Sequence, residues 1–126
     1  MDVPRERRRK GDDIAARLLA FAVRVIKLTE CLPRSVAGRH ISNQLMRAAT
    51  SVGANYEEAR GGESRADFVH KVGVAWKETR EATYWLRVIR EAALVNPARL
   101  ADLLHEGEEL SAILGASSKT AKQIGA

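Results

Sequence analysis

A chain of 126 residues, 45% hydrophobic and 29% charged, is long enough to bury a core as one soluble domain without disulfides or metal. No apolar stretch approaches the ~20 residues that a membrane span needs, and no signal-peptide pattern is evident. The single cysteine, Cys31, excludes an internal disulfide, so we expect a cytoplasmic location. The net charge of +5 suits a polyanionic partner, although solvated helix faces would explain it equally well.

Apolar periodicity divides the chain into a basic arm, four helices and a short tail. The arm covers residues 1–11 and has no periodicity. In the sequence that follows, apolar residues recur at alternating four- and three-residue intervals, which line one side of a helix. A bundle domain is predicted at residues 12–118 and a frayed tail at 119–126. The four predicted helices span about 12–32, 38–60, 64–95 and 97–115.

Capping and breaking residues set these limits. Pro33 ends the first helix, and Ser64 followed by Asp67 begins the third in the manner of a capping box. Pro97 takes the first turn of the fourth helix, which is expected to end near Gly115. Because every link is short, consecutive helices should be antiparallel neighbours. The sequence therefore predicts an all-α, up-down-up-down four-helix bundle.

The third helix carries more apolar groups than one core stripe accommodates. The residues outside the main stripes are Val69, Val74, Trp76, Tyr84, Trp85 and Val88 on this helix, with Leu19, Ala22 and Ile26 on the first. Large apolar groups left outside a core usually mark an interface. We expect self-association through this face, with Glu78 and Glu81 meeting Arg or Lys of a neighbouring copy. The alternative is a wide core stripe with exposed tryptophan edges.

Two Asp-x-x-His pairs, Asp67/His70 and Asp102/His105, invite comparison with the metal sites of helical bundles. Both pairs occupy outer helix positions near opposite ends of antiparallel helices. We therefore expect no shared metal and no other cofactor.

Two Arg–His spacings, Arg65/His70 and Arg34/His40, match the loose pattern of helical ribonucleases of the HEPN class. In those enzymes an Arg and a His would act on a phosphodiester as charge stabiliser and proton-transfer group. The pattern is short enough to arise by chance in an Arg-rich chain. No other catalytic grouping is present, so we expect no catalytic residue and no enzyme.

Basic residues gather in the arm and on the helix faces. Residues 1–10 carry five basic and two acidic groups, and residues 14–93 carry thirteen basic and eight acidic groups. Residues 97–116 are acidic, with one arginine and four carboxylates. Contacts from such cations would be to phosphates and weakly sequence-specific. The candidate nucleic-acid-binding residues are Arg5, Arg7, Arg8, Arg9, Lys10, Arg47, Arg60, Arg80, Arg87 and Arg90.

A denser motif crosses the second and third helices. The run Arg47-Ala-Ala-Thr-Ser51-Val-Gly-Ala-Asn55-Tyr-Glu-Glu58-Ala59 resembles the RxATSxGANxxEA segment of the 23S rRNA intervening-sequence proteins. The family's DFxxKxxxAxKExxExxYWL pattern follows at the expected distance, here as Asp67-Phe68, Lys71, Ala75, Lys77-Glu78, Glu81 and Tyr84-Trp85-Leu86. With the flanking helices in matching order, the resemblance spans essentially the whole body of the chain.

This resemblance implies a left-handed four-helix bundle that assembles into a ring, usually a pentamer. The family is similar to the accessory proteins of diversity-generating retroelements, which bind nucleic acid and a reverse transcriptase, and it lends no catalytic residue. The residues assigned to helix or subunit contacts are Ser51, Asn55, Glu58, Lys71, Trp76, Glu78, Glu81 and Trp85. The chain departs from the family pattern in its Arg-rich start and at Tyr56-Glu57.

The predicted function follows from the basic surface and the resemblance together. We expect a non-enzymatic, pentameric bundle that binds nucleic acid as an RNA- or reverse-transcriptase-associated accessory protein. The alternative is a protein–protein scaffold without nucleic acid, and a HEPN-like ribonuclease comes third. No membrane partner is expected.

Overall fold

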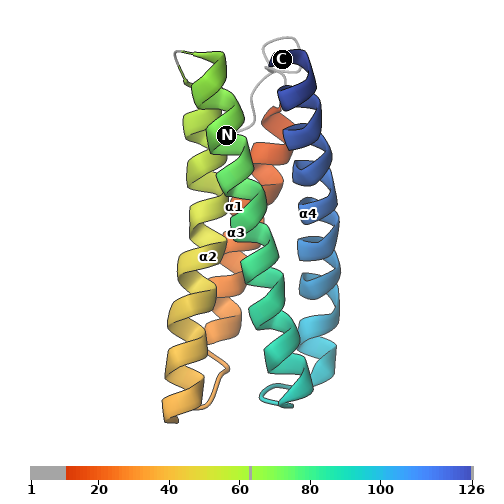
Figure 1. The fold of residues 1–126 in the computed structure, drawn as a ribbon. Helices are drawn as coiled ribbons and strands as arrows, with labels where there is room; N and C mark the ends of the chain where they lie inside the picture. The colour runs from red at the N-terminus through yellow and green to blue at the C-terminus, as the bar shows by residue number, and fades with distance from the viewer. Residues whose placement is uncertain (1–10, 63, 126) are drawn as a thin grey trace.

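The computed structural model describes residues 11–62 and 64–125, and four α-helices account for most of them (Figure 1). They are α1 (Asp12–Thr29), α2 (Val36–Arg60), α3 (Arg65–Glu91) and α4 (Pro97–Gly125). No strand occurs within the described ranges. The four helices confirm the all-α part of the predicted fold class. The predicted basic arm lies outside the described residues, apart from Gly11.

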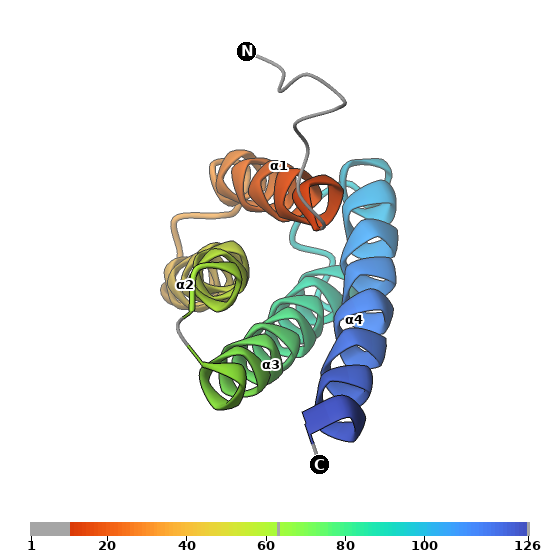
Figure 2. The ribbon, with the colours of Figure 1, turned by 90° about the horizontal axis from the view of Figure 1, so that it is seen from above.

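Consecutive helices pack side by side, and α1 also packs against α4, so the four helices enclose one core (Figure 2). The α1–α2 and α3–α4 connections lie at one end of the molecule, and the α2–α3 turn lies at the other (Figure 1). Seen from above, α1 and α3 stand diagonally across the bundle (Figure 2). The outer surfaces of α1 and α3 therefore face in different directions.

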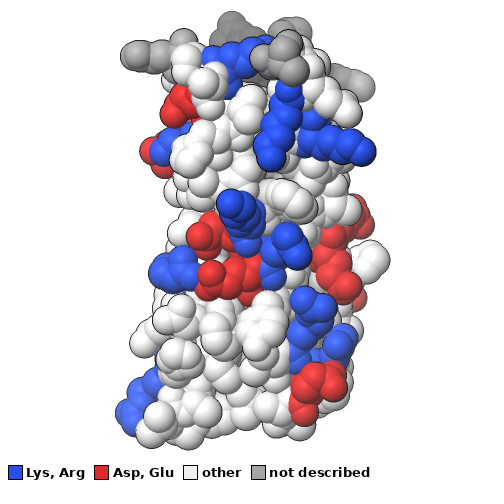
Figure 3. All heavy atoms as spheres, viewed as in Figure 1, with Lys and Arg blue, Asp and Glu red and all other residues white. Residues whose placement is uncertain are grey.

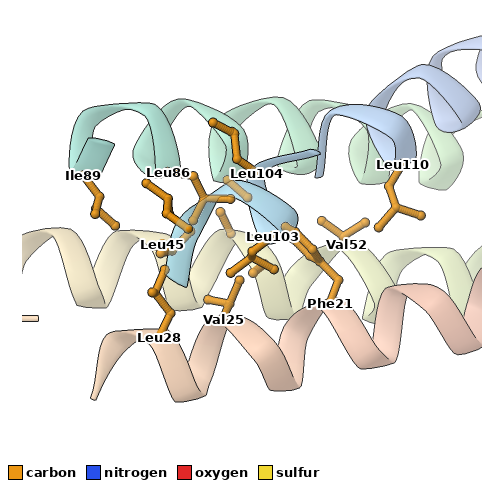
Figure 4. Close-up of a cluster of buried hydrophobic side chains, with 14 of the residues drawn as sticks. Phe21, Val25, Leu28, Leu45, Val52, Leu86, Ile89, Leu103, Leu104 and Leu110 are labelled. Atoms are coloured by element: carbon orange, nitrogen blue, oxygen red, sulfur yellow. The ribbon is translucent and has the colours of Figure 1, made fainter. Parts of the chain in front are cut away.

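The core is built from the apolar stripes of all four helices. Phe21, Leu45, Leu86 and Leu110 are almost completely buried, one from each helix, and their side chains converge between the helices (Figure 4). The heptad positions predicted for these helices thus form the core. Asn55, the polar residue in the α2 stripe, donates from Nδ2 to the Ser51 carbonyl at 2.9 Å, within its own helix.

Helix α3 ends earlier than predicted, at Glu91. Ala93 adopts the left-handed conformation with φ of 54°. The backbone N–H groups of Ala93 and Leu94 donate to the carbonyls of Arg90 and Ile89, at 3.0 and 3.1 Å. This is a Schellman motif, which satisfies carbonyls at a helix end and turns the chain before Pro97 is reached. Helix α1 also ends earlier than predicted, at Thr29, but without a left-handed residue: the N–H groups of Cys31 and Leu32 donate to the carbonyls of Leu28 and Thr29, and Pro33 follows.

Helix α4 was predicted to end near Gly115 with a frayed tail, but this prediction is wrong because the helix continues to Gly125. Gly115 lies within the helix, and a Cβ there would stand 2.9 Å from Trp76 Nε1 of α3. The glycine therefore makes room for an indole and does not stop the helix. Ser118 and Ala121 of the extension are buried. Packing on α3 thus holds the segment predicted to fray.

A bidentate ion pair joins α1 to α4. Arg17 donates from Nε to Glu106 Oε2 at 3.0 Å and from Nη2 to Glu106 Oε1 at 2.7 Å, and Nη2 also reaches Glu109 Oε1 at 2.7 Å. These hydrogen bonds hold the pKa of Glu106 below its usual range and raise the pKa of Arg17. The pair therefore stabilises the fold only while Glu106 is ionised.

We expect Ala93→Gly to raise the free energy of unfolding by about 0.5–1 kcal/mol, because relief of a Cβ in the left-handed region (about 1–2 kcal/mol) exceeds the added unfolded-state entropy (about 0.5–1 kcal/mol). Urea denaturation measures the change. Ala92→Gly is the matched control and should destabilise, because Ala92 is in the right-handed helical region. A lower stability for Ala93→Gly would contradict the assignment of strain.

We expect a pH-dependent loss of stability that depends on Glu106. Its folded pKa is lowered, so the contribution is complete above the pKa of a free Glu and is lost as the pH falls through the folded pKa. Glu106→Gln should remove this part of the acid dependence, while Glu108→Gln, an exposed carboxyl on the same helix, should keep it. Urea denaturation above and below the pKa of a free Glu makes the comparison. Equal curves for the two variants would contradict the role of the pair.

Candidate nucleic-acid interface

The outer face of α3 carries a stripe of exposed basic residues with one exposed aromatic residue among them. Lys77, Arg80, Tyr84 and Arg87 follow one another at intervals of three, four and three residues, so they lie on one side of the helix over ~15 Å. All four are exposed, and Tyr84 keeps 53% of its surface in solvent. We call these four residues the α3 stripe.

The α3 stripe forms one wall of a shallow groove between α3 and α4. The groove has a volume of about 840 Å³, and its α4 wall consists of Glu108, Ser111, Ala112, Gly115 and Ala116. Figure 3 shows Lys and Arg side chains along much of this face of the molecule, with acidic groups gathered beside them. Small side chains on α4 keep the groove open. Its positive charge lies on the α3 side, whereas the charged residue of the α4 wall is the acidic Glu108.

Neighbouring aromatic rings hold parts of the α3 stripe in place. The Arg80 guanidinium lies 5.4 Å from the centre of the Trp76 ring, a cation–π contact. Tyr84 meets Trp85 edge-to-face, with ring centres 5.2 Å apart and an interplanar angle of 74°. Trp85 in turn donates from Nε1 to Glu81 Oε2 at 3.2 Å. The stripe is therefore partly ordered before any ligand arrives.

Two of the predicted nucleic-acid contacts are engaged within the chain. Arg47 of α2 binds Glu81 and lies 3.3 Å from Glu78 Oε2, and the bond to Glu81 raises the pKa of Arg47. Arg60 binds Asp12 of α1 and lies 2.8 Å from Glu57 Oε1; its bond to Asp12 raises its pKa. These guanidiniums link helices.

The remaining predicted cations divide into three groups. Arg90 pairs with its sequence neighbour Glu91 at 3.0 Å, an exposed contact of little energetic weight. Arg80 and Arg87 are exposed and have no carboxylate partner among the described residues. Arg5, Arg7, Arg8, Arg9 and Lys10 lie outside the described residues.

Lys77 and Tyr84 complete the stripe but were not among the predicted nucleic-acid-binding residues. The signal was in the sequence, because the interval pattern of 77, 80, 84 and 87 is that of one helix face. The shared face becomes evident only when these four positions are considered together. The exposed Tyr84 was instead counted among the surplus apolar groups.

Glu78 and Glu81, which are predicted to meet Arg or Lys of a neighbouring copy, both contact Arg47 of the same chain, and a contact with a neighbouring copy stays a prediction. The surplus apolar surface of α3 is also smaller than expected. Trp76 and Trp85 are partly buried and pack against the core. The alternative of a wide core stripe with exposed tryptophan edges describes them better.

The exposed apolar surface lies mainly on α1. Leu19, Val23 and Ile26 are exposed, Leu19 at 67%, and they line a groove of about 720 Å³ with Gly53 and Ala54 of α2. Leu19 and Ile26 were predicted to form an outer row. This row of three exposed apolar residues is therefore on the helix diagonally across from the α3 stripe (Figure 2).

The polar positions of the family motif make contacts within and between helices. Ser51 Oγ donates to the Arg47 carbonyl at 2.8 Å, inside α2. Lys71 Nζ lies 3.3 Å from Glu58 Oε1 and joins α3 to α2. Together with the Arg47 pairs, these contacts tie α2 to α3. Their proposed use between subunits stays a prediction.

The histidine pairs do not come together. Arg65 and His70 lie at the start of α3, whereas Arg34 and His40 lie at the other end of the bundle, and all four are exposed (Figure 1). Among residues 11–62 and 64–125, no three His, Cys, Asp or Glu side chains gather as metal ligands would. None of the described helices is long and apolar enough to cross a membrane.

The sequence and the fold both match known proteins. The family model of the 23S rRNA-intervening sequence proteins matches residues 13–116. A crystal structure from Bacteroides thetaiotaomicron, described as a protein of unknown function from the S23 ribosomal protein family, matches with a TM-score of 0.77 and 31% identity, over 84% of this chain and 98% of that one. Among curated proteins, none matches this chain. The family match covers most of the chain, from the first turn of α1 well into α4, and this protein belongs to the 23S rRNA-intervening sequence protein family.

Proposed function

We propose that this protein is a non-enzymatic, oligomeric accessory protein that binds nucleic acid phosphates through the α3 stripe. The observation that carries the proposal is the set of exposed cations on one helix face: Lys77, Arg80 and Arg87. None of the three has a carboxylate partner among the described residues, in contrast to Arg47 and Arg60. Cations without an internal partner remain available for phosphate oxygens.

Contacts of this kind depend on charge rather than on base identity. Phosphate binding releases condensed counterions, so the affinity should fall steeply with salt and vary little with sequence. The net charge of +5 adds long-range attraction. We therefore propose RNA or DNA as the partner. The family resemblance adds a reverse transcriptase as an associated protein, and the exposed free thiol of Cys31 supports a cytoplasmic setting.

The proposal includes self-association through α1, with a pentamer as the state that the family resemblance implies. The exposed Leu19, Val23 and Ile26 form a contiguous apolar row beside small residues of α2. Burial of such a row against a second copy would remove apolar surface from water. Repeated copies would also present several α3 stripes to one nucleic acid, which raises avidity without new contacts.

The finer architecture belongs to the same proposal. Short links and the placement of the three connections at alternating ends support an up-down-up-down, antiparallel order (Figure 1). The left-handed turn of the bundle rests on the family resemblance.

We expect the triple variant Lys77→Gln/Arg80→Gln/Arg87→Gln to bind RNA and DNA more weakly than the unmodified protein. The slope of log affinity against log salt should fall by about 2 to 3, one unit or slightly less for each lost phosphate contact. Fluorescence polarisation with labelled oligonucleotides across a salt series measures both quantities.

The control for this triple variant removes the same charge elsewhere, with Arg24→Gln/Arg39→Gln/Lys119→Gln on exposed positions of α1, α2 and α4. It should keep most of the salt slope. An equal loss in both triple variants would assign binding to net charge alone and reject the α3 stripe as the interface. No binding at low salt would leave the scaffold function.

We expect Leu19→Glu/Val23→Glu to dissociate the oligomer. Light scattering should give a mass several times 13.9 kDa for the unmodified protein and a mass near 13.9 kDa for the variant. Val36→Glu is the matched control, because Val36 is 81% exposed at the start of α2, away from the α1 row. A monomeric unmodified protein at micromolar concentration would end the oligomer proposal.

A further inference from the structure

The α3 stripe combines cations with an aromatic ring in a fixed order. Arg80 precedes Tyr84 by four residues and Arg87 follows it by three, so the ring lies ~6 Å and ~4.5 Å along the helix axis from the two guanidinium-bearing positions. Tyr84 is the one ring of the groove that is more than half exposed. Phosphate binding by itself does not need an aromatic side chain at this place.

The two aromatic residues of the groove have different surroundings. Trp76 is partly buried, packs over Gly115 and carries the Arg80 guanidinium 5.4 Å from its ring centre. The Trp76 ring is therefore already covered by contacts within the protein and is less available for stacking on a ligand. Tyr84 contacts Trp85 edge-to-face and keeps 53% of its surface in solvent, so the contact restrains the ring while much of its surface stays free. A held aromatic ring loses little conformational entropy when a ligand stacks on it.

The opposite wall of the groove is unsuited to a second strand of phosphates. Helix α4 has no Lys or Arg between Arg99 and Lys119. Glu108 lines the groove and has no ion-pair partner among the residues that the structure describes. Packed helices lie about 8–10 Å apart, so a duplex whose first strand followed α3 would bring its second strand over α4. Only one side of the groove attracts phosphate.

We infer that the nucleic acid bound at the α3 stripe is single-stranded, with an unpaired base stacked on Tyr84 and phosphates held by Arg80 and Arg87. This inference rests on the proposed nucleic-acid binding and names its ligand class. A single strand can follow the basic wall alone and turn a base toward the small side chains of Ser111 and Ala112. Bases of a duplex are already stacked on each other and cannot reach the ring.

The test compares Tyr84→Ala with Tyr84→Phe on two probes, a fluorescein-labelled single-stranded oligouridylate and an RNA duplex of the same length. The unmodified protein should bind the single strand more tightly. Tyr84→Ala should lower the single-strand affinity by at least roughly fivefold, the lower limit of one stacked base, while the duplex affinity and the salt slope stay unchanged. Tyr84→Phe keeps the ring and should keep the affinity.

A second variant tests the α4 wall without touching the stacking ring. Glu108→Gln removes the negative charge opposite the α3 stripe. It should lower the ratio of single-strand affinity to duplex affinity, because the second strand of the duplex would no longer be repelled by this carboxylate. Circular dichroism melting checks that each variant is folded. The comparison of single-strand and duplex affinity for the unmodified protein tests the inference without any variant.

The outcomes separate this inference from the proposed function. Equal affinity of the unmodified protein for the single strand and the duplex, or an equal effect of Tyr84→Ala on both probes, would overturn the single-strand inference and leave nucleic-acid binding intact. Absence of binding to either probe at low salt would reject both.

Discussion

The close packing of α4 against α3 is the constraint on which the rest of the structure depends. Two glycines of α4 permit it, since a Cβ at Gly107 would stand 2.8 Å from Thr83 Cγ2 and one at Gly115 would stand 2.9 Å from Trp76 Nε1. The contact packs α4 against the Trp76 indole, whose ring centre also lies 5.4 Å from the Arg80 guanidinium. The same packing stabilises the last turns of α4, which extends to Gly125, and it shapes the groove beside the α3 stripe.

Charge is used in two ways in this bundle. Arg17, Arg47 and Arg60 each reach a carboxylate on another helix, so they tie α1 to α4, α2 to α3 and α2 to α1. Such partly exposed pairs add modest energy but favour one set of helix neighbours over others. Lys77, Arg80 and Arg87 of the α3 stripe make no ion pair with another described helix. What distinguishes the candidate interface is therefore that cations without a carboxylate partner among the described residues share one helix face with an exposed aromatic ring.

The two candidate surfaces lie on helices that stand diagonally across the bundle. The apolar row of α1 and the α3 stripe share no residue, and the core separates them (Figure 2). Copies joined through α1 would leave the basic faces open. This geometry allows assembly and nucleic-acid binding to occur together, as avidity requires. The family match supports the fold that creates this arrangement.

Local sequence pattern was sufficient for the four helices, most of the core and the cap at Ser64, because these follow from nearest neighbours along a helix. It also contained the family motif. The partners of Arg47, Glu78 and Glu81, and the role of Gly115, depended on which helices become neighbours and how closely they approach. A charge that is paired and a charge that is free look the same in a sequence. Only the packing of the helices, which brings residues thirty or more positions apart within bonding distance, distinguishes them.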